Sequence, residues 1–254
     1  MLSKNKLKYI RSLSLKKHRD AEKAFIAEGP KVVLDLMGAF HCRLLLGSQE
    51  FLQNHDELVA DEIIEVEQKE LEQASTLKSP REALAIFSQT RTTTDSLDKD
   101  GVQPLALALD GVQDPGNLGT IIRIADWYGI QDIYCSYNSA DVYSTKVIQA
   151  TMGAIARVHV HYVDLPDYIS NHCQNVPVYG TFLDGDDMYR MDLKTGGLIV
   201  MGNEGNGISE ELEKLVTRKL YIPNYPEGQK TSESLNVAVA TAITCAEFRR
   251  QSKI

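Results

Sequence analysis

The sequence predicts an α/β protein with two units, a smaller one in the first 90 residues and a larger one that begins at residue 104. In the larger unit, unbroken apolar runs alternate with stretches whose apolar residues recur at helical spacing, which is typical of a parallel sheet with helices on both faces. Residues 91–103 are polar and show no periodicity, as expected of a linker. We therefore assign residues 1–90 and 104–254 to two domains.

The first domain is predicted to begin with a short basic helix and to continue as a small α/β unit. Apolar residues at helical spacing with lysines between them indicate a helix over residues 7–13. Gly29 and Pro30 end the first strand, and Pro30 suits the first turn of a helix that continues to Met37. We expect strands at residues 25–28, 43–46, 63–66 and 83–87, and a further helix at residues 69–75.

The second domain is predicted to open on a fully apolar strand, residues 105–109, which leads into a helix over residues 118–128. Further strands are expected at residues 133–135, 157–163, 178–181 and 198–201. The last helix, residues 234–250, is apolar on nearly all sides in its first half, which indicates burial in a core or at a subunit interface. We therefore expect a homodimer that uses this helix and the helix at residues 118–128.

Composition excludes several classes of protein. Hydrophobic residues make up 43% and charged residues 24% of the 254, which is ordinary for a globular chain, and no apolar run approaches the roughly 20 residues of a membrane span. The four cysteines are widely spaced and form no Cys/His cluster, which argues against a zinc site and a disulfide framework and favours the cytoplasm. The basic start of the chain carries no apolar stretch behind it, unlike a secretory signal.

Charge is distributed unevenly along the chain. Residues 1–23 hold eight Lys/Arg against two acidic residues, a net +6, so the remainder carries −14 of the total of −8. A basic N-terminal segment on an acidic body predicts a local nucleic-acid contact. The expected contact residues are Lys4, Lys6, Lys8, Arg11, Lys16, Lys17 and Arg19.

Three glycine- and asparagine-rich loops follow predicted strands, at the edge of the sheet where open α/β folds bind ligands. In the first, Asn117 is a good N-cap, and Gly119 lies one helical turn before Arg123, so we expect the guanidinium to be uncovered. By itself this loop is equally consistent with a capped surface helix that carries a solvated arginine.

The second loop has glycines at 202, 205 and 207, between a buried strand and a helix opened by Ser209. This spacing fits neither the dinucleotide fingerprint nor a phosphate-binding P-loop. The third runs from Ile222-Pro223 to Ser234-Leu235-Asn236-Val237, where Ser234 can cap the last helix and the Asn236 amide needs a partner. Each loop alone could be a structural turn.

The three loops in this order resemble the SpoU family of RNA ribose 2′-O-methyltransferases, of the SPOUT class. The matching pattern is Asn117-x-Gly119-x-x-x-Arg123, Gly202-Asn203-Glu204-Gly205-x-Gly207, Ile222-Pro223 and Ser234-Leu235-Asn236-Val237, within residues 104–250. The resemblance implies a trefoil-knotted parallel-sheet domain. The first 90 residues resemble the small RNA-binding domain that often precedes it, similar to ribosomal proteins of the kink-turn type.

The resemblance implies methyl transfer from S-adenosylmethionine to a ribose 2′-hydroxyl of RNA, without a metal. It implies Arg123 as the central catalytic residue, with Asn117, Glu204, Ser234 and Asn236 around it. Because a guanidinium stays protonated in proteins, we interpret Arg123 as a clamp on the RNA phosphate and not as a base. The implied cofactor-binding residues are Gly202, Asn203, Gly207, Ile222, Pro223 and Leu235. The loop between Ile222 and Ser234 is longer than in many members.

Three alternatives remain open at this point. The protein could be a catalytically silent RNA-binding module of the same fold, although the intact Asn117, Arg123, Ser234 and Asn236 argue against this. It could be a dehydrogenase or methyltransferase of the Rossmann type, but there the glycine loop follows the first strand of the domain. It could also act on tRNA, while the N-terminal domain favours rRNA.

Overall fold

The computed structural model describes residues 2–90, 103–193, 195–226, 232 and 234–252. The chain divides into two compact units, of which the first comprises Met1–Arg91 with Asp141–Arg157, and the second Thr92–Ala140 with Val158–Ile254. In the described part of the chain no helix is long and apolar enough to cross a bilayer.

The first unit is built on a four-stranded mixed sheet with the order β1-β4-β2-β3. Strands β1 and β2 pair with β4 in antiparallel fashion, whereas β3 runs parallel to β2. Ile10 and Leu13 from the N-terminal helix region pack with Leu71 on one face of this sheet. The elements are α1 (Lys4–Ser12), α2 (Lys16–Glu22), β1 (Ala24–Glu28), α3 (Pro30–Met37), β2 (Cys42–Gly47), α4 (Gln49–Asn54), β3 (Ile63–Glu65), α5 (Gln68–Ala74) and β4 (Ala83–Ser88).

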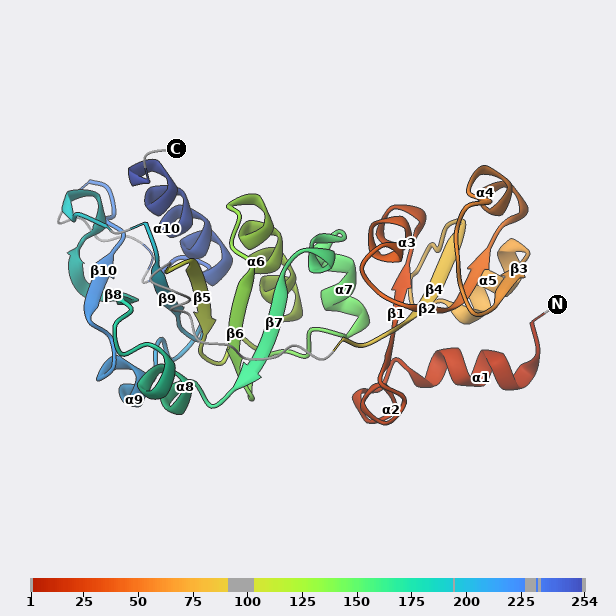
Figure 1. Cartoon of the computed structure of the whole chain (residues 1–254), viewed down its shortest axis with the longest axis horizontal. Helices are drawn as coiled ribbons and strands as arrows, with labels where there is room; N and C mark the ends of the chain where they lie inside the picture. Colours follow the sequence, from red (N-terminus) through yellow and green to blue (C-terminus); the bar gives the residue numbers. More distant parts are fainter. Residues whose placement is uncertain (1, 91–102, 194, 227–231, 233, 253–254) are drawn as a thin grey trace. The chain divides into compact units, whose positions relative to one another are not determined.

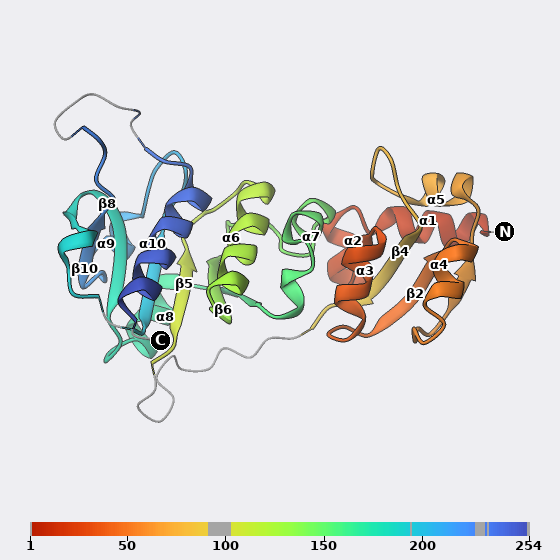
Figure 2. The same ribbon diagram turned by 90° about the horizontal axis from the view of Figure 1, so that it is seen from above.

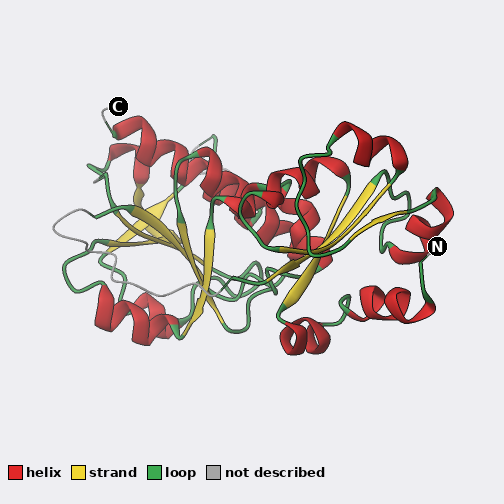
Figure 3. Ribbon diagram, turned by 45° about the vertical axis from the view of Figure 1, so that its right-hand side comes forward, coloured by secondary structure: helices red, strands yellow, loops and turns green. Residues whose placement is uncertain are grey.

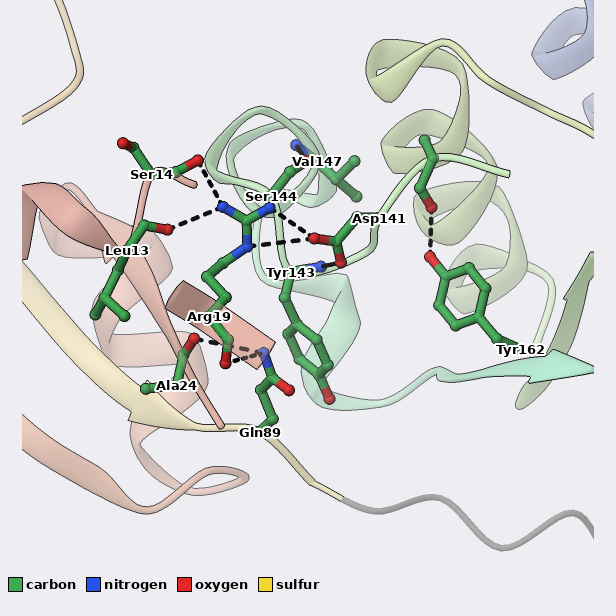
Figure 4. Close-up of polar contacts among 11 residues, drawn as sticks. Leu13, Ser14, Arg19, Ala24, Gln89, Asp141, Tyr143, Ser144, Val147 and Tyr162 are labelled. Atoms are coloured by element: carbon green, nitrogen blue, oxygen red, sulfur yellow. Dashed lines mark hydrogen bonds and ion pairs between the residues drawn. The ribbon is translucent and has the colours of Figure 1, made fainter. Parts of the chain in front are cut away.

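Residues 141–157 belong to this first unit, although in the chain they lie between two strands of the second. They form α7 (Thr145–Thr151) and the short 3-10 helix η1 (Ala154–Ala156). The Tyr143 ring lies 4.9 Å from that of Phe25 on β1. The buried Arg19 side chain donates to Asp141 and to backbone carbonyls (Figure 4). The sequence places the whole of 104–254 in one domain, because contacts between residues 122 positions apart leave no local signal.

The second unit contains a six-stranded sheet with the order β10-β8-β9-β5-β6-β7. Every pairing in it is parallel, so all six strands end at the same edge. The strands are β5 (Leu105–Leu109), β6 (Asp132–Ser136), β7 (His159–Val163), β8 (Val178–Asp187), β9 (Gly197–Met201) and β10 (Arg218–Tyr221). The central strands β5 and β9 are buried throughout, as expected from their unbroken apolar sequences.

Helices cover both faces of this second sheet (Figure 3). On one face α6 (Pro115–Trp127) and α10 (Val237–Gln251) lie side by side, as Figures 1 and 2 both show. The Phe248 ring of α10 contacts Tyr179 of β8 edge to face, with 4.8 Å between centroids. The other face packs against Leu165, Ile169 and Leu212. Their helices are α8 (Leu165–His172) and α9 (Glu210–Glu213).

The predicted α/β fold with a parallel sheet is confirmed, with differences at element ends. Helix α6 begins three residues earlier than expected, because Asp114 caps it and Pro115 occupies its first position. The expected strand at 157–163 begins only at His159, since a 3-10 turn ends at Arg157. Strand β8 continues to Asp187, where its end pairs with Tyr221 of β10. The linker 91–103 lies almost wholly outside the described residues.

Candidate active site

The structure joins one side chain from each of the three predicted loops. Asn117 donates from Nδ2 to Oε1 of Glu204 at 2.7 Å, and its Oδ1 accepts from Nδ2 of Asn236 at 2.9 Å. Asn117 lies in the first turn of α6, Glu204 in the loop after β9, and Asn236 at the start of α10. Residues separated by as many as 119 positions therefore form one polar network at the carboxyl edge of the sheet.

Asn117 can join this network because it is not the N-cap of α6, contrary to the sequence-based expectation. The cap is Asp114, whose Oδ1 accepts from the backbone N–H of Asn117 at 2.8 Å. Asp114, three residues before Asn117, thus satisfies a backbone N–H group that has no partner within the first turn of the helix. The amide of Asn117 is thereby available to neighbouring loops.

The cap of the last helix also differs from the sequence-based expectation. Asn236, not Ser234, caps α10, since its Oδ1 accepts from the backbone N–H groups of Ala238 and Val239 at 3.0 and 3.3 Å. Its Nδ2 donates to Asn117, so both ends of the amide have partners. Ser234 precedes the cap and is exposed. Its hydroxyl is therefore not required for the helix.

The loop after β9 is a tight turn that depends on glycine. Asn203 and Gly207 exchange two backbone hydrogen bonds of 2.9 Å, and the Asn203 Oδ1 accepts from two N–H groups inside the turn. A Cβ on Gly202 would lie 2.2 Å from the carbonyl carbon of Gly207, and Gly207 itself has a φ of +70°. Only glycine suits these two positions, because a side chain would collide at the first and strain the backbone at the second.

Two contacts that sequence analysis missed tie this turn to the first loop. The Nδ2 of Asn203 donates to the carbonyl oxygen of Gly111 at 2.7 Å. The carboxylate of Asp110 accepts from the backbone N–H of Ser209, at the N-cap of α9, at 2.8 Å. The aspartates at 110 and 114 precede the matched motif and had no distinguishing signal in the sequence.

Arg123 is exposed on α6 and stands outside the network. Among the residues that the structure describes, none makes a hydrogen bond or ion pair with its guanidinium. It lies six residues after Asn117, so the two side chains leave the helix about 120° apart. Leu118, Ile121 and Ile122 bury the opposite side of α6. Gly119 is buried as well, on the helix that packs against α10. Within the described part of the chain the guanidinium is therefore exposed and without a polar partner.

The residues expected to bind the cofactor are brought to the same sheet edge by their strands. Ile222 and Pro223 follow β10 directly and are half-buried, whereas Leu235 is 47% exposed just before α10. A glycine turn exposes backbone groups that can hydrogen-bond an adenine ring, and apolar side chains can cover the faces of that ring, so these residue types fit the expected group. Most of the loop between Pro223 and Ser234 lies outside the described residues, as does the lining it would provide.

The described residues form no evident metal-binding site. No group of three or more His, Cys, Asp or Glu side chains within 2–90, 103–193, 195–226, 232 and 234–252 is placed to hold an ion. All four cysteines are free and buried. Burial raises the pKa of the Cys42 and Cys173 thiols to about 11, which disfavours the thiolate.

Two family models match the chain. One is described as the SpoU rRNA methylase family and covers residues 104–246; the other, an MRM3-like substrate binding domain, covers residues 4–85. The chain belongs to the SpoU rRNA methylase family. The network of Asn117, Glu204 and Asn236 lies within the residues that this family model matches.

Relatives of this SpoU-family chain include proteins named as rRNA methyltransferases. It is 37% identical over 145 residues to the Bacillus subtilis 23S rRNA (guanosine(2553)-2′-O)-methyltransferase RlmP. The aligned residues cover 56% of this chain and 57% of that protein. The chain spans between 53% and 62% of the length of the first three curated relatives it matches.

Several solved structures match the SpoU-family chain along nearly its whole length. One, of a TrmH-family protein from Porphyromonas gingivalis, is 41% identical with a TM-score of 0.89, and the match covers 99% of this chain and 100% of that one. Another, an AdoMet-bound rRNA methyltransferase from Sinorhizobium meliloti, is 29% identical with a TM-score of 0.86 and covers 100% and 97%.

Proposed function

We propose that this protein transfers a methyl group from S-adenosylmethionine to a ribose 2′-hydroxyl of rRNA. The observation that carries the proposal is the polar network of Asn117, Glu204 and Asn236, which joins all three motif loops at one sheet edge. Membership of the SpoU family and the names of the relatives support the reaction type. The preceding MRM3-like domain supports rRNA over tRNA as substrate.

The bound cofactor would supply an electrophilic methyl group on a sulfonium, held by Gly202, Asn203, Gly207, Ile222, Pro223 and Leu235. The task of the chain is then to place the ribose oxygen in line with it and to manage the proton of the hydroxyl. Glu204 is suited to accept a hydrogen bond from that ribose hydroxyl. In the described structure only its Oε1 accepts one, from Asn117, which holds the carboxylate in place.

Arg123 binds the phosphate beside the target ribose in this proposal, as a protonated, two-pronged donor. Its exposure and lack of an ion-pair partner among the described residues support the role. Ser234, exposed next to the Asn236 cap, donates its hydroxyl to the ribose or the phosphate. Asn236 and Asn117 hold the loops that present these groups.

The first unit binds the RNA in the same proposal, with fewer cations than the sequence predicts. The prediction that Arg19 contacts RNA is wrong, because this residue is 3% exposed and paired with Asp141. Lys6 pairs with Glu62, and Arg11 donates to the carbonyl of Gln73 at 2.6 Å. The exposed Lys4, Lys8, Lys16 and Lys17 remain as the cationic surface.

The protein is further proposed to be a homodimer that pairs through α6 and α10 and works in the cytoplasm. Val239 on α10 is 48% exposed and Trp127 at the end of α6 is 85% exposed, although both helices pack against the sheet. Light scattering tests this: a stable, active monomer contradicts it. The trefoil knot implied by the family remains a prediction.

The deciding experiment is transfer of tritiated methyl from S-adenosylmethionine to total RNA from cells that lack the protein. Incorporation into rRNA, followed by mapping of a single 2′-O-methyl nucleotide, is the expected result. Incorporation into tRNA alone would support the other substrate. RNA binding without any incorporation would identify a catalytically silent member of the fold.

A further inference from the structure

The loop that follows β6, residues 136–140, is held rigidly against the first motif loop. Ser136 accepts on its Oγ from the backbone N–H of Gly111 at 2.8 Å, and Ser139 donates to the carbonyl of Leu109 at 3.3 Å. The N–H of Ala140 donates to the carbonyl of Val112 at 2.9 Å, and its own carbonyl accepts from the Tyr162 hydroxyl. The loop therefore has little freedom to move away from residues 109–112.

Tyr137 is the exception within this anchored loop. Its side chain is 70% exposed, and no described residue makes a hydrogen bond with its hydroxyl. The residues on either side are fixed, since Ser136 donates to the Oδ1 of Asn138 at 2.6 Å. A rigid backbone thus presents a large, mostly apolar ring to solvent at the carboxyl edge of the sheet.

The loop that carries this ring is joined to the candidate active site through Gly111. Gly111 contacts the Tyr137 loop through its N–H and the glycine turn through its carbonyl, which accepts from Asn203 at 2.7 Å. Asn117 follows six residues later and bonds to Glu204. All of these residues belong to the second unit.

We propose that Tyr137 is an RNA-binding residue that stacks on a base next to the methylated nucleotide, an inference that rests on the proposed function. Sequence-specific RNA recognition mostly targets loops and bulges whose bases are already unstacked, and we take the target nucleotide to lie in such a segment. Unstacked bases are stabilised on exposed aromatic rings, and one such contact is worth about 1–3 kcal/mol. A rigid ring makes this contact at a small entropic cost.

The phenol ring, and not its hydroxyl, carries the proposed contact. Tyr137→Phe keeps the stacking face, Tyr137→Leu keeps an apolar side chain without it, and Tyr137→Ala removes both. Tyr189 serves as a control of similar type, since it is 48% exposed in the same unit and lies on the 3-10 helix η2 (Met188–Arg190), which is not part of any of the three motif loops. Because the Tyr137 side chain is 70% exposed, these variants should have little effect on folding.

The experiment measures binding of a 23S rRNA transcript and the steady-state kcat and KM for its methylation. We expect Tyr137→Ala and Tyr137→Leu to weaken binding and raise KM by roughly tenfold, while Tyr137→Phe and Tyr189→Ala stay within about twofold of wild type. Ultraviolet cross-linking should also attach a nucleotide to the peptide that contains Tyr137.

Two results would overturn the inference. Unchanged binding and KM in Tyr137→Ala would show that the ring makes no contact with RNA. A loss in Tyr137→Phe equal to that in Tyr137→Ala would show that the hydroxyl acts and stacking does not. Failure of the proposed function is separate, because it appears as absence of methylation by the wild type, and the binding and cross-linking measurements still decide the role of Tyr137.

Discussion

Replacement of Asp141 by asparagine should detach residues 141–157 from the first unit. The Oδ2 of Asp141 accepts from the Nη2 and Nε of Arg19 at 2.6 and 3.2 Å (Figure 4). The Arg19 side chain is only 4% exposed, and that of Asp141 18%. The other prong of the guanidinium, Nη1, donates to the carbonyls of Leu13 and Ser14. Asp141→Asn leaves a buried cation without its counter-charge.

The magnitude follows from this geometry. Loss of one partner of a buried ion pair costs about 3–5 kcal/mol, because the remaining charge stays desolvated. Asparagine still offers one oxygen acceptor, and Arg19 keeps two carbonyl partners, so we expect the lower end, about 3 kcal/mol. As a control, Lys31→Gln breaks the exposed 3.8 Å pair with Asp35 in the same unit, which should cost under about 1 kcal/mol.

Hydrogen exchange resolved by mass spectrometry is the suitable assay, since a protein with two units need not unfold in a single step. Amides of α7 should lose protection in Asp141→Asn, whereas those of β9 in the second unit should exchange as in wild type. A double-mutant cycle with Arg19→Met should show coupling between the two changes. Unchanged protection of α7 in Asp141→Asn would refute the reasoning.

Three further predictions concern catalysis and RNA binding. Arg123→Ala should abolish methyl transfer and leave the fold intact. Arg123→Lys should also lose most of the activity, because an ammonium cannot form the two-pronged contact with phosphate. Near-normal single-turnover rates in the lysine variant would show that any cation suffices at this position. Gly202→Ala should remove binding of S-adenosylmethionine, measured by calorimetry, because its Cβ would collide with the Gly207 backbone; affinity equal to wild type would contradict the described turn. Lys16→Glu with Lys17→Glu should lower the slope of log affinity for rRNA against log salt by about one per lost phosphate contact, and an unchanged slope would remove these lysines from the RNA interface.

The sequence by itself determined most strands, the α/β class and the residues of the candidate site. Strands such as Leu105–Leu109 were predictable because burial on both faces of a parallel sheet demands an unbroken apolar run, which is a local signal. Asn117, Glu204 and Asn236 were expected because their motifs resemble those of the SpoU family. Their meeting could be inferred because parallel strands deliver the loops that follow them to one edge.

Only the tertiary structure decided how the residues share their tasks. Asp and Asn are both favourable N-cap residues, so the sequence does not decide between Asp114 and Asn117. In the structure Asp114 caps α6, and Asn117 instead contacts Glu204 in another loop. The same applies to Ser234 and Asn236. Residues 141–157 belong to the first unit because Asp141 meets an arginine 122 residues earlier in the chain. Burial of Arg19 likewise removes it from the basic surface, because local sequence shows charge but not the distant partner that neutralises it.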